Sequence, residues 1–187
     1  MNVPIGIIGG SGLREARIAQ KIDPLSPYAI GGVILVLDLS GNVPEALELR
    51  KKSAMLFPDL NWTPLEMARM LREAGRGDEA VAELIRGLRS TGATPLATAV
   101  EKEYRAHGAD RAIRLYLRDA HLTRVYSRWM SARFHALVGD RQAALDDLER
   151  SYANGEAGVV FANAAREFAP LREEPRFRAL IAKMNLD

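Results

Sequence analysis

The chain has 187 residues, of which 48% are hydrophobic, and 26 basic against 24 acidic side chains give it a net charge of +2. It is long enough to bury a core of its own, and so small a net charge gives no argument for a nucleic-acid partner. The absence of cysteine excludes disulfides, thiolate metal sites and cysteine nucleophiles.

The N-terminal stretch, residues 1–23, contains a short glycine-rich sequence between an apolar segment and a predicted helix. If it forms a strand, a turn and a helix start, its backbone N–H groups could hold a phosphate. It resembles the opening of the nucleoside phosphorylases that cleave methylthioadenosine, and this resemblance implies phosphate binding by Gly9, Gly10, Ser11 and Gly12. The interpretation that we favour is a truncated repeat whose second helix spans residues 13–22, because nothing downstream shows the strand-helix alternation of that enzyme fold.

A repeat of 34 residues begins at residue 24. Gly41 and Gly75 are 34 residues apart, and each is followed five residues later by an alanine, Ala46 or Ala80. The same step from glycine to alanine recurs at Gly139 and Ala144. A period of this length predicts stacked pairs of helices rather than an ordinary enzyme core.

Helix signals fit this period in the first two units. Ser26 is predicted to cap a helix with Pro27 in its first turn, and Thr63 to cap one that begins at Pro64. Glu66 completes a capping box with Thr63. The glycines end these first helices, and the second helix of the first unit is predicted to end near residues 57–58.

The later units follow the same scheme with small departures. Thr94 is predicted to cap the third unit, with Pro95 in the first turn. Its turn lies near Gly108, where the step from glycine to alanine shortens to four residues, ending at Ala112. The fourth unit is expected over residues 123–138 and 141–152. In every unit the small residue after the turn should lie where the two helices cross closely.

This pattern resembles tetratricopeptide repeats over residues 24–154, as about four units. The resemblance implies an all-α fold, an α-solenoid of antiparallel helix pairs wound as a right-handed superhelix. Residues 155–187 resemble the tail of tetratricopeptide arrays in bacterial cyclase, kinase and winged-helix regulatory proteins. Pro175 should open a last helix whose Phe177, Leu180 and Ile181 cap the final apolar face. Because the effector domain of those proteins is missing, we expect either a C-terminal fragment or a protein that works in trans.

The function expected from this resemblance is a non-catalytic scaffold that binds a protein or peptide segment in a concave groove, as part of bacterial signalling. The first helix of each pair should line the groove, and aromatic and arginine side chains are the usual binding anchors. The predicted groove residues are Tyr28, Leu35, Asp38, Trp62, Arg69, Arg72, Glu103, Tyr126, Trp129 and Arg133. Two alternatives stay open, a phosphate- or nucleotide-binding enzyme that uses residues 9–12 and self-association through uncovered end faces.

Other chemistry has weaker signals. The three histidines, at positions 107, 121 and 135, lack metal-ligand spacing, so neither a metal nor a cofactor is expected. A basic stretch runs from Lys102 to Arg133, and we interpret it as a solvated face, with an acidic or phosphorylated peptide partner as the alternative.

No run approaches the roughly 18 apolar residues of a membrane span, and with no convincing targeting segment the expected location is the cytoplasm.

Overall fold

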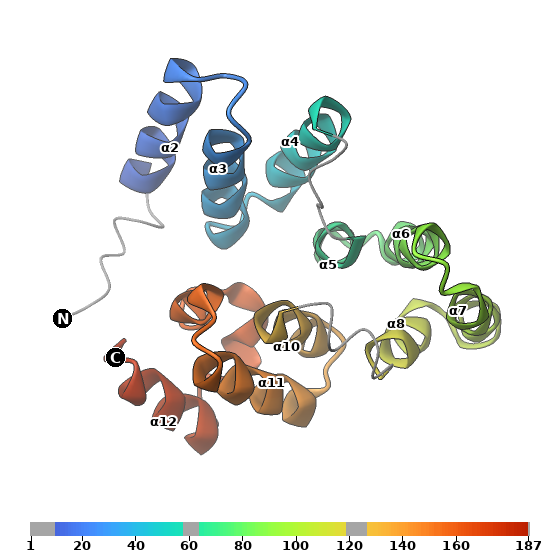
Figure 1. The fold of residues 1–187 in the computed structure, drawn as a ribbon. Coiled ribbons are helices and arrows are strands. Elements are labelled where there is room, and N and C mark those ends of the chain that lie inside the picture. Colours follow the sequence, from blue (N-terminus) through green and yellow to red (C-terminus); the bar gives the residue numbers. More distant parts are fainter. Residues whose placement is uncertain (1–9, 58–63, 119–126, 187) are drawn as a thin grey trace. The chain divides into compact units, whose positions relative to one another are not determined.

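The computed structural model describes residues 10–57, 64–118 and 127–186, and within these ranges it contains helices and no strand (Figure 1). The chain divides into two compact units. The first unit is Met1–Trp62 with Leu186–Asp187, and the second is Thr63–Asn185. The all-α prediction is confirmed, and no helix in the described ranges is long and apolar enough to cross a membrane.

The described part of the first unit is a row of three helices with the most apolar one in the middle. These are α2 (Gly10–Ile22), α3 (Pro27–Leu39) and α4 (Val43–Leu56). Helix α3 packs against both neighbours, as Figure 1 shows. It is apolar around most of its circumference, so it needs cover on two sides. Its N-cap is Ser26, as predicted, whose Oγ accepts a hydrogen bond from the Ala29 N–H at 3.3 Å.

In its described residues, the second unit contains three helix pairs and a C-terminal tail. The pairs are α5 (Pro64–Glu73) with α6 (Gly77–Ser90), α7 (Thr94–His107) with α8 (Ala109–Leu117), and α10 (Arg128–Leu137) with α11 (Arg141–Ala153). The tail contains the 3-10 helices η1 (Ala157–Phe161) and η2 (Arg166–Leu171) and the helix α12 (Pro175–Lys183). Helices pack within each pair, and α5 also packs against α10.

The predicted glycine turns are present, and three of the four share one hydrogen-bond pattern. Their glycines have positive φ angles, from +76° at Gly139 to +93° at Gly41. The residue after Gly41, Gly75 or Gly139 donates its N–H to a carbonyl five residues back, for example Asn42 to Leu37 at 2.8 Å and Asp140 to His135 at 2.9 Å, whereas Gly108 closes its turn differently. This left-handed closure satisfies the last carbonyls of a helix and lets the next helix begin at once.

The alanine after each turn lies in the core, as predicted. Four alanines have no exposed surface and donate the first i to i−4 hydrogen bond of their helix, namely Ala46, Ala80, Ala112 and Ala144. Two constraints therefore act on this alanine. It begins the hydrogen bonds of its helix, and it lies in close contact with the preceding helix.

One predicted helix start is wrong by one residue. Thr94 is the first residue of α7 and not its cap, and the N-cap position falls on Ala93 without a side-chain hydrogen bond. The N–H of Ala93 closes the preceding turn on the Leu88 carbonyl at 2.9 Å, so this one residue both ends α6 and starts α7. The predicted cap Thr63 and the predicted start near residue 123 lie outside the described residues.

The predicted last helix is observed, and its role as a cap on a repeat array remains a prediction. Helix α12 begins at Pro175, and Phe177, Leu180 and Ile181 are buried. The ring of Phe168 bridges the cap to α10, with its centroid 5.6 Å from that of Trp129 and 6.2 Å from that of Phe177. Such tilted aromatic contacts add stability beyond the buried area itself.

Candidate functional site

Charged side chains from three elements meet in the interior of the second unit. Arg69 and Glu73 come from α5, Arg133 from α10 and Glu167 from η2, and we call these four residues the inner cluster. The side chains of Arg69, Arg133 and Glu167 are at most 3% exposed.

The members of the inner cluster are paired with one another. Arg69 Nη1 lies 2.8 Å from Glu73 Oε2 and 3.8 Å from Glu167 Oε1. Arg133 Nε donates to Glu167, and the half-exposed Arg166 donates to Glu73. Removing one member of a buried ion pair leaves the other without compensation, so this cluster ties α5, α10 and η2 together.

The inner cluster contains two of the predicted groove residues. Arg69 and Arg133 are buried, and Trp129 lies beside them, with the Arg133 guanidinium carbon 5.4 Å from its ring centroid. Their surroundings are therefore other parts of this chain, and their role toward a partner stays a prediction.

The other predicted groove residues lie at separate places. In the first unit Tyr28 is 89% exposed and Leu35 38%, whereas Asp38 is buried. In the second unit Arg72 pairs with Asp110 and Glu103 with Arg111. Trp62 and Tyr126 lie outside the described residues, so the groove as a whole remains a prediction.

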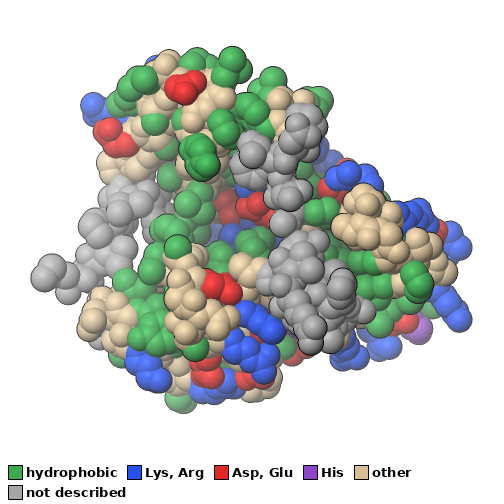
Figure 2. Space-filling view, in the orientation of Figure 1, with side chains coloured by type: hydrophobic (Ala, Val, Ile, Leu, Met, Phe, Trp, Pro, Cys, Tyr) green, Lys and Arg blue, Asp and Glu red, His purple; other side chains and the backbone are tan. Residues whose placement is uncertain are grey.

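A second group of cations lies on α7 and α8. We call it the basic surface, and it consists of Lys102, Arg105, Arg111, Arg114 and Arg118. Figure 2 shows Lys and Arg side chains gathered around the α6–α8 region. The sequence signal for this surface was the basic stretch that begins at Lys102. Lys102 and Arg118 form no ion pair with any residue that the structure describes.

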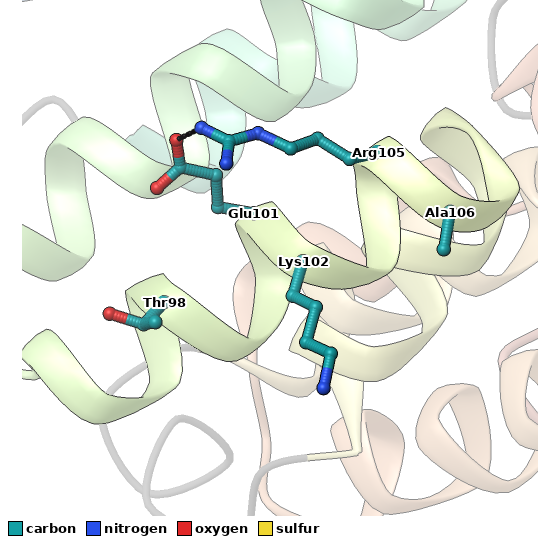
Figure 3. A pocket seen from close by; sticks show the side chains of 5 residues that line it. All are labelled: Thr98, Glu101, Lys102, Arg105 and Ala106. Atoms are coloured by element: carbon teal, nitrogen blue, oxygen red, sulfur yellow. Dashed lines mark hydrogen bonds and ion pairs between the residues drawn. The ribbon is translucent and has the colours of Figure 1, made fainter.

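The part of the basic surface on α7 is an open hollow of about 410 Å³. It is lined by Thr98, Glu101, Lys102, Arg105 and Ala106. Figure 3 shows the Arg105 side chain turned back onto Glu101, while Lys102 extends away from this pair. The hollow thus offers an anionic ligand two cations, Arg105, which is paired with Glu101, and Lys102, which has no ion pair within the described ranges.

The part on α8 is a smaller hollow of about 350 Å³, which we call the α8 hollow. It is lined by Glu103, Arg111, Arg114, Leu115 and Arg118. Arg111 Nε donates to Glu103 Oε1 at 3.1 Å, and this hydrogen bond lowers the pKa of Glu103. Arg114 donates to the Val138 carbonyl at the end of α10, which fixes its guanidinium.

The glycine-rich N-terminal sequence forms part of a helix. Gly10, Ser11 and Gly12 are in the first turn of α2, and Gly9 lies outside the described residues. The expected turn is therefore helical from Gly10 onward. A phosphate contact at residues 9–12 remains a prediction.

The histidines do not form a metal site in the described part of the chain. His135 is buried between Asp140 and Asp147, with nitrogen-to-oxygen distances of 3.8 Å to each. Burial lowers the pKa of His135 and raises that of Asp147. His107 lies 3.2 Å from Glu103, and position 121 is outside the described residues.

Comparisons with known proteins give no family for this chain. No protein-family model matches it, and neither a curated protein nor a solved structure matches it. The helix pairs are thus an observation, and their assignment as tetratricopeptide repeats remains a prediction.

The sequence analysis did not identify two members of the inner cluster, Glu73, which lies four residues after Arg69 on α5, and Glu167. Glu167 lies in a 3-10 helix of the tail, where no helical period marks its position. It meets Arg69, which is 98 positions away along the chain, only because η2 packs against α10. A carboxylate without a neighbouring basic residue at helical spacing gives no signal of such a partner.

Proposed function

We propose that this protein is a non-catalytic interaction module that binds an acidic peptide segment across the basic surface. The observation that carries this proposal is a pair of cations, Lys102 and Arg118, that lack an ion-pair partner among the described residues and lie in open hollows. A fixed array of arginine and lysine side chains favours carboxylate-rich partners and speeds their encounter.

The packing of the helices supports a module that presents a surface. The inner cluster and the aromatic contacts of the tail fix the helix pairs, and α7 and α8 expose their basic side chains outside that core. We also propose a role in bacterial signalling, because residues 155–187 resemble the tails of tetratricopeptide arrays in bacterial regulatory proteins. The arrangement of the helix pairs as a tetratricopeptide superhelix is part of the same proposal.

The test compares two variants with the same charge change. Lys102→Gln/Arg118→Gln removes these two cations without breaking an ion pair among the described residues. The control Arg172→Gln/Lys183→Gln removes two exposed cations near and on α12. Fluorescence anisotropy with a glutamate-rich peptide should show a loss of about three- to tenfold for the first variant only, since each exposed charge contributes up to about 1 kcal/mol.

Two outcomes of this titration would contradict the proposal. One is equal binding of the acidic peptide to both variants, and the other is equal binding of a lysine-rich peptide to the wild type. Added salt should weaken the binding of the acidic peptide, because exposed charges are screened.

Self-association is a second candidate, favoured by exposed hydrophobic side chains in the first unit. Most of the large hydrophobic side chains exposed in the described part of the chain lie there, namely Ile18, Ile22, Leu25, Tyr28, Leu35, Met55 and Leu56. In Figure 2 hydrophobic side chains are visible over α2 and α3. Surfaces of this kind mark interaction sites. Sedimentation over a wide concentration range, repeated with Ile22→Ser/Tyr28→Ser, should show association that the variant loses.

A further inference from the structure

Two arginines of α8, Arg111 and Arg114, share one face with Arg118, the C-cap residue of that helix. Arg111, Arg114 and Arg118 are spaced by three and four residues, which places their side chains side by side. All three line the α8 hollow together with Glu103 and Leu115. Arginine matches tetrahedral oxyanions better than lysine does, because its planar fork can donate two parallel hydrogen bonds.

The three guanidinium groups are held to different degrees. Arg114 is anchored on the Val138 carbonyl, and Arg111 is held by Glu103. The exposed Arg118 has no ion pair within the described residues. Two positioned donors and one available donor therefore face a single hollow.

The charge of the hollow matches a doubly charged ligand. Three guanidinium groups and one carboxylate leave a net charge of +2 among the described residues that line it. A phosphate monoester carries about −1.5 to −2 charges at neutral pH and three acceptor oxygens. A side-chain carboxylate carries one charge and two acceptor oxygens, so it would use the three donors only in part.

We propose that the α8 hollow binds the phosphate monoester of a phosphorylated serine or threonine in a peptide partner, an inference that rests on the proposed function. The phosphate lies between Arg114 and Arg118 and draws Arg111 from Glu103. Leu115 contacts the carbon atoms of the peptide beside the phosphate. Glu103 opposes binding, because its carboxylate both repels the phosphate and competes for Arg111.

The experiment uses three peptides that differ at one position, which is serine, glutamate or phosphoserine. Their affinities for the full chain are measured by fluorescence anisotropy in the same buffer. The phosphoserine peptide should bind about tenfold more tightly than the glutamate peptide, because it adds a charge and an acceptor oxygen in one site. The serine peptide should bind weakest.

Two variants test the hollow itself. Arg118→Gln should bring the phosphoserine and glutamate affinities to within about twofold of each other, and the matched control Arg172→Gln should leave their ratio unchanged. Glu103→Gln should raise the phosphoserine affinity about two- to fivefold, since it removes a nearby negative charge. A gain in binding cannot come from loss of folding, so this variant tests the inference even if other substitutions unfold the chain.

The outcomes separate this inference from the proposed function. Equal affinities for the phosphoserine and glutamate peptides would overturn the phosphate site and leave the acidic-peptide module standing. Absence of binding by both would overturn both. Inorganic phosphate or a short single-stranded oligonucleotide that displaces the phosphopeptide at equal phosphate concentration would show a general anion site and overturn the peptide assignment.

Discussion

Gly108 shows how one residue sets the spacing of a repeat. Its φ of +81° and ψ of −178° lie in a region that is essentially restricted to glycine. The other turns close with a hydrogen bond across five residues, whereas the N–H of Gly108 bonds only four residues back, to Tyr104. The chain therefore enters α8 one residue earlier, and this accounts for the step of four from Gly108 to Ala112.

Gly108→Ala should lower the free energy of unfolding by about 1–3 kcal/mol, because alanine is strained at these angles. The control is Gly32→Ala in α3, where a new Cβ would meet no atom within 4 Å. That change should be neutral or stabilise the protein by up to about 1 kcal/mol. Chemical denaturation of both variants measures the difference, and equal midpoints would contradict the strain argument.

Gly158 is constrained by contact rather than by its backbone angles. A Cβ at this position would lie 2.4 Å from Cδ1 of Trp129, so η1 packs directly against the indole ring. Gly158→Ala should destabilise the protein by about 1–3 kcal/mol through overpacking, and should change the near-ultraviolet circular dichroism of the tryptophan. An unchanged spectrum with unchanged stability would show that η1 can move away at no cost.

At the scale of elements, helix α10 is capped both by its N-cap residue Ser127 and by a residue from another part of the chain. Glu156 follows α11, yet its carboxylate accepts hydrogen bonds from the backbone N–H groups of Arg128 and Trp129 at 3.0 and 2.9 Å. Ser151 donates a third hydrogen bond at 3.0 Å. A carboxylate at a helix N-terminus satisfies free N–H groups and complements the helix dipole.

Glu156 should make the free energy of unfolding depend on pH. Burial alone would raise the pKa of Glu156, but the backbone hydrogen bonds from Trp129 and Arg128 outweigh it and the pKa is lowered. The stability that the Glu156 carboxylate contributes to the folded protein is therefore complete above the unfolded-state pKa, about 4.3. This contribution is lost as the pH falls through the folded-state pKa.

Glu156→Gln should lower the free energy of unfolding by about 1–2 kcal/mol at neutral pH. The difference from the wild type should shrink at acidic pH, where the wild-type carboxylate is also protonated. Denaturation curves at several pH values measure this difference, and a gap that stays constant down to pH values below the folded-state pKa would contradict the capping role.

At the scale of the whole molecule, the inner cluster joins α5, α10 and η2 of the second unit. Glu167→Gln leaves Arg133 and Arg69 buried with a partner missing and should destabilise the protein by about 3–5 kcal/mol. The control Glu173→Gln breaks an ion pair with Arg178 whose side chains are 86% and 62% exposed. It should cost less than about 1 kcal/mol. Similar losses in both variants would show that the cluster has no special role.

The amino-acid sequence by itself determined most of the local structure. Glycine at the end of a helix and proline in a first turn act within a few residues, so α3, α4, α5 and α12 begin or end close to their predicted positions. The buried alanine after each turn follows from the same local rules, because the crossing of two helices joined by a short turn is fixed by that turn. Thr94 departs by one residue because Ala93 also has to close the preceding helix.

Only the tertiary structure decided which charged side chains are buried and which remain on the surface. Arg69 and Arg72 lie three residues apart on α5, yet the first is buried on Glu73 and Glu167 and the second pairs with Asp110 at the edge. Their difference depends on η2 and α10, which are distant in sequence. The same holds for Arg118, since its availability depends on which acidic side chains the fold brings near it. Partners of this kind are set by packing over long separations, and no local pattern in the sequence records them.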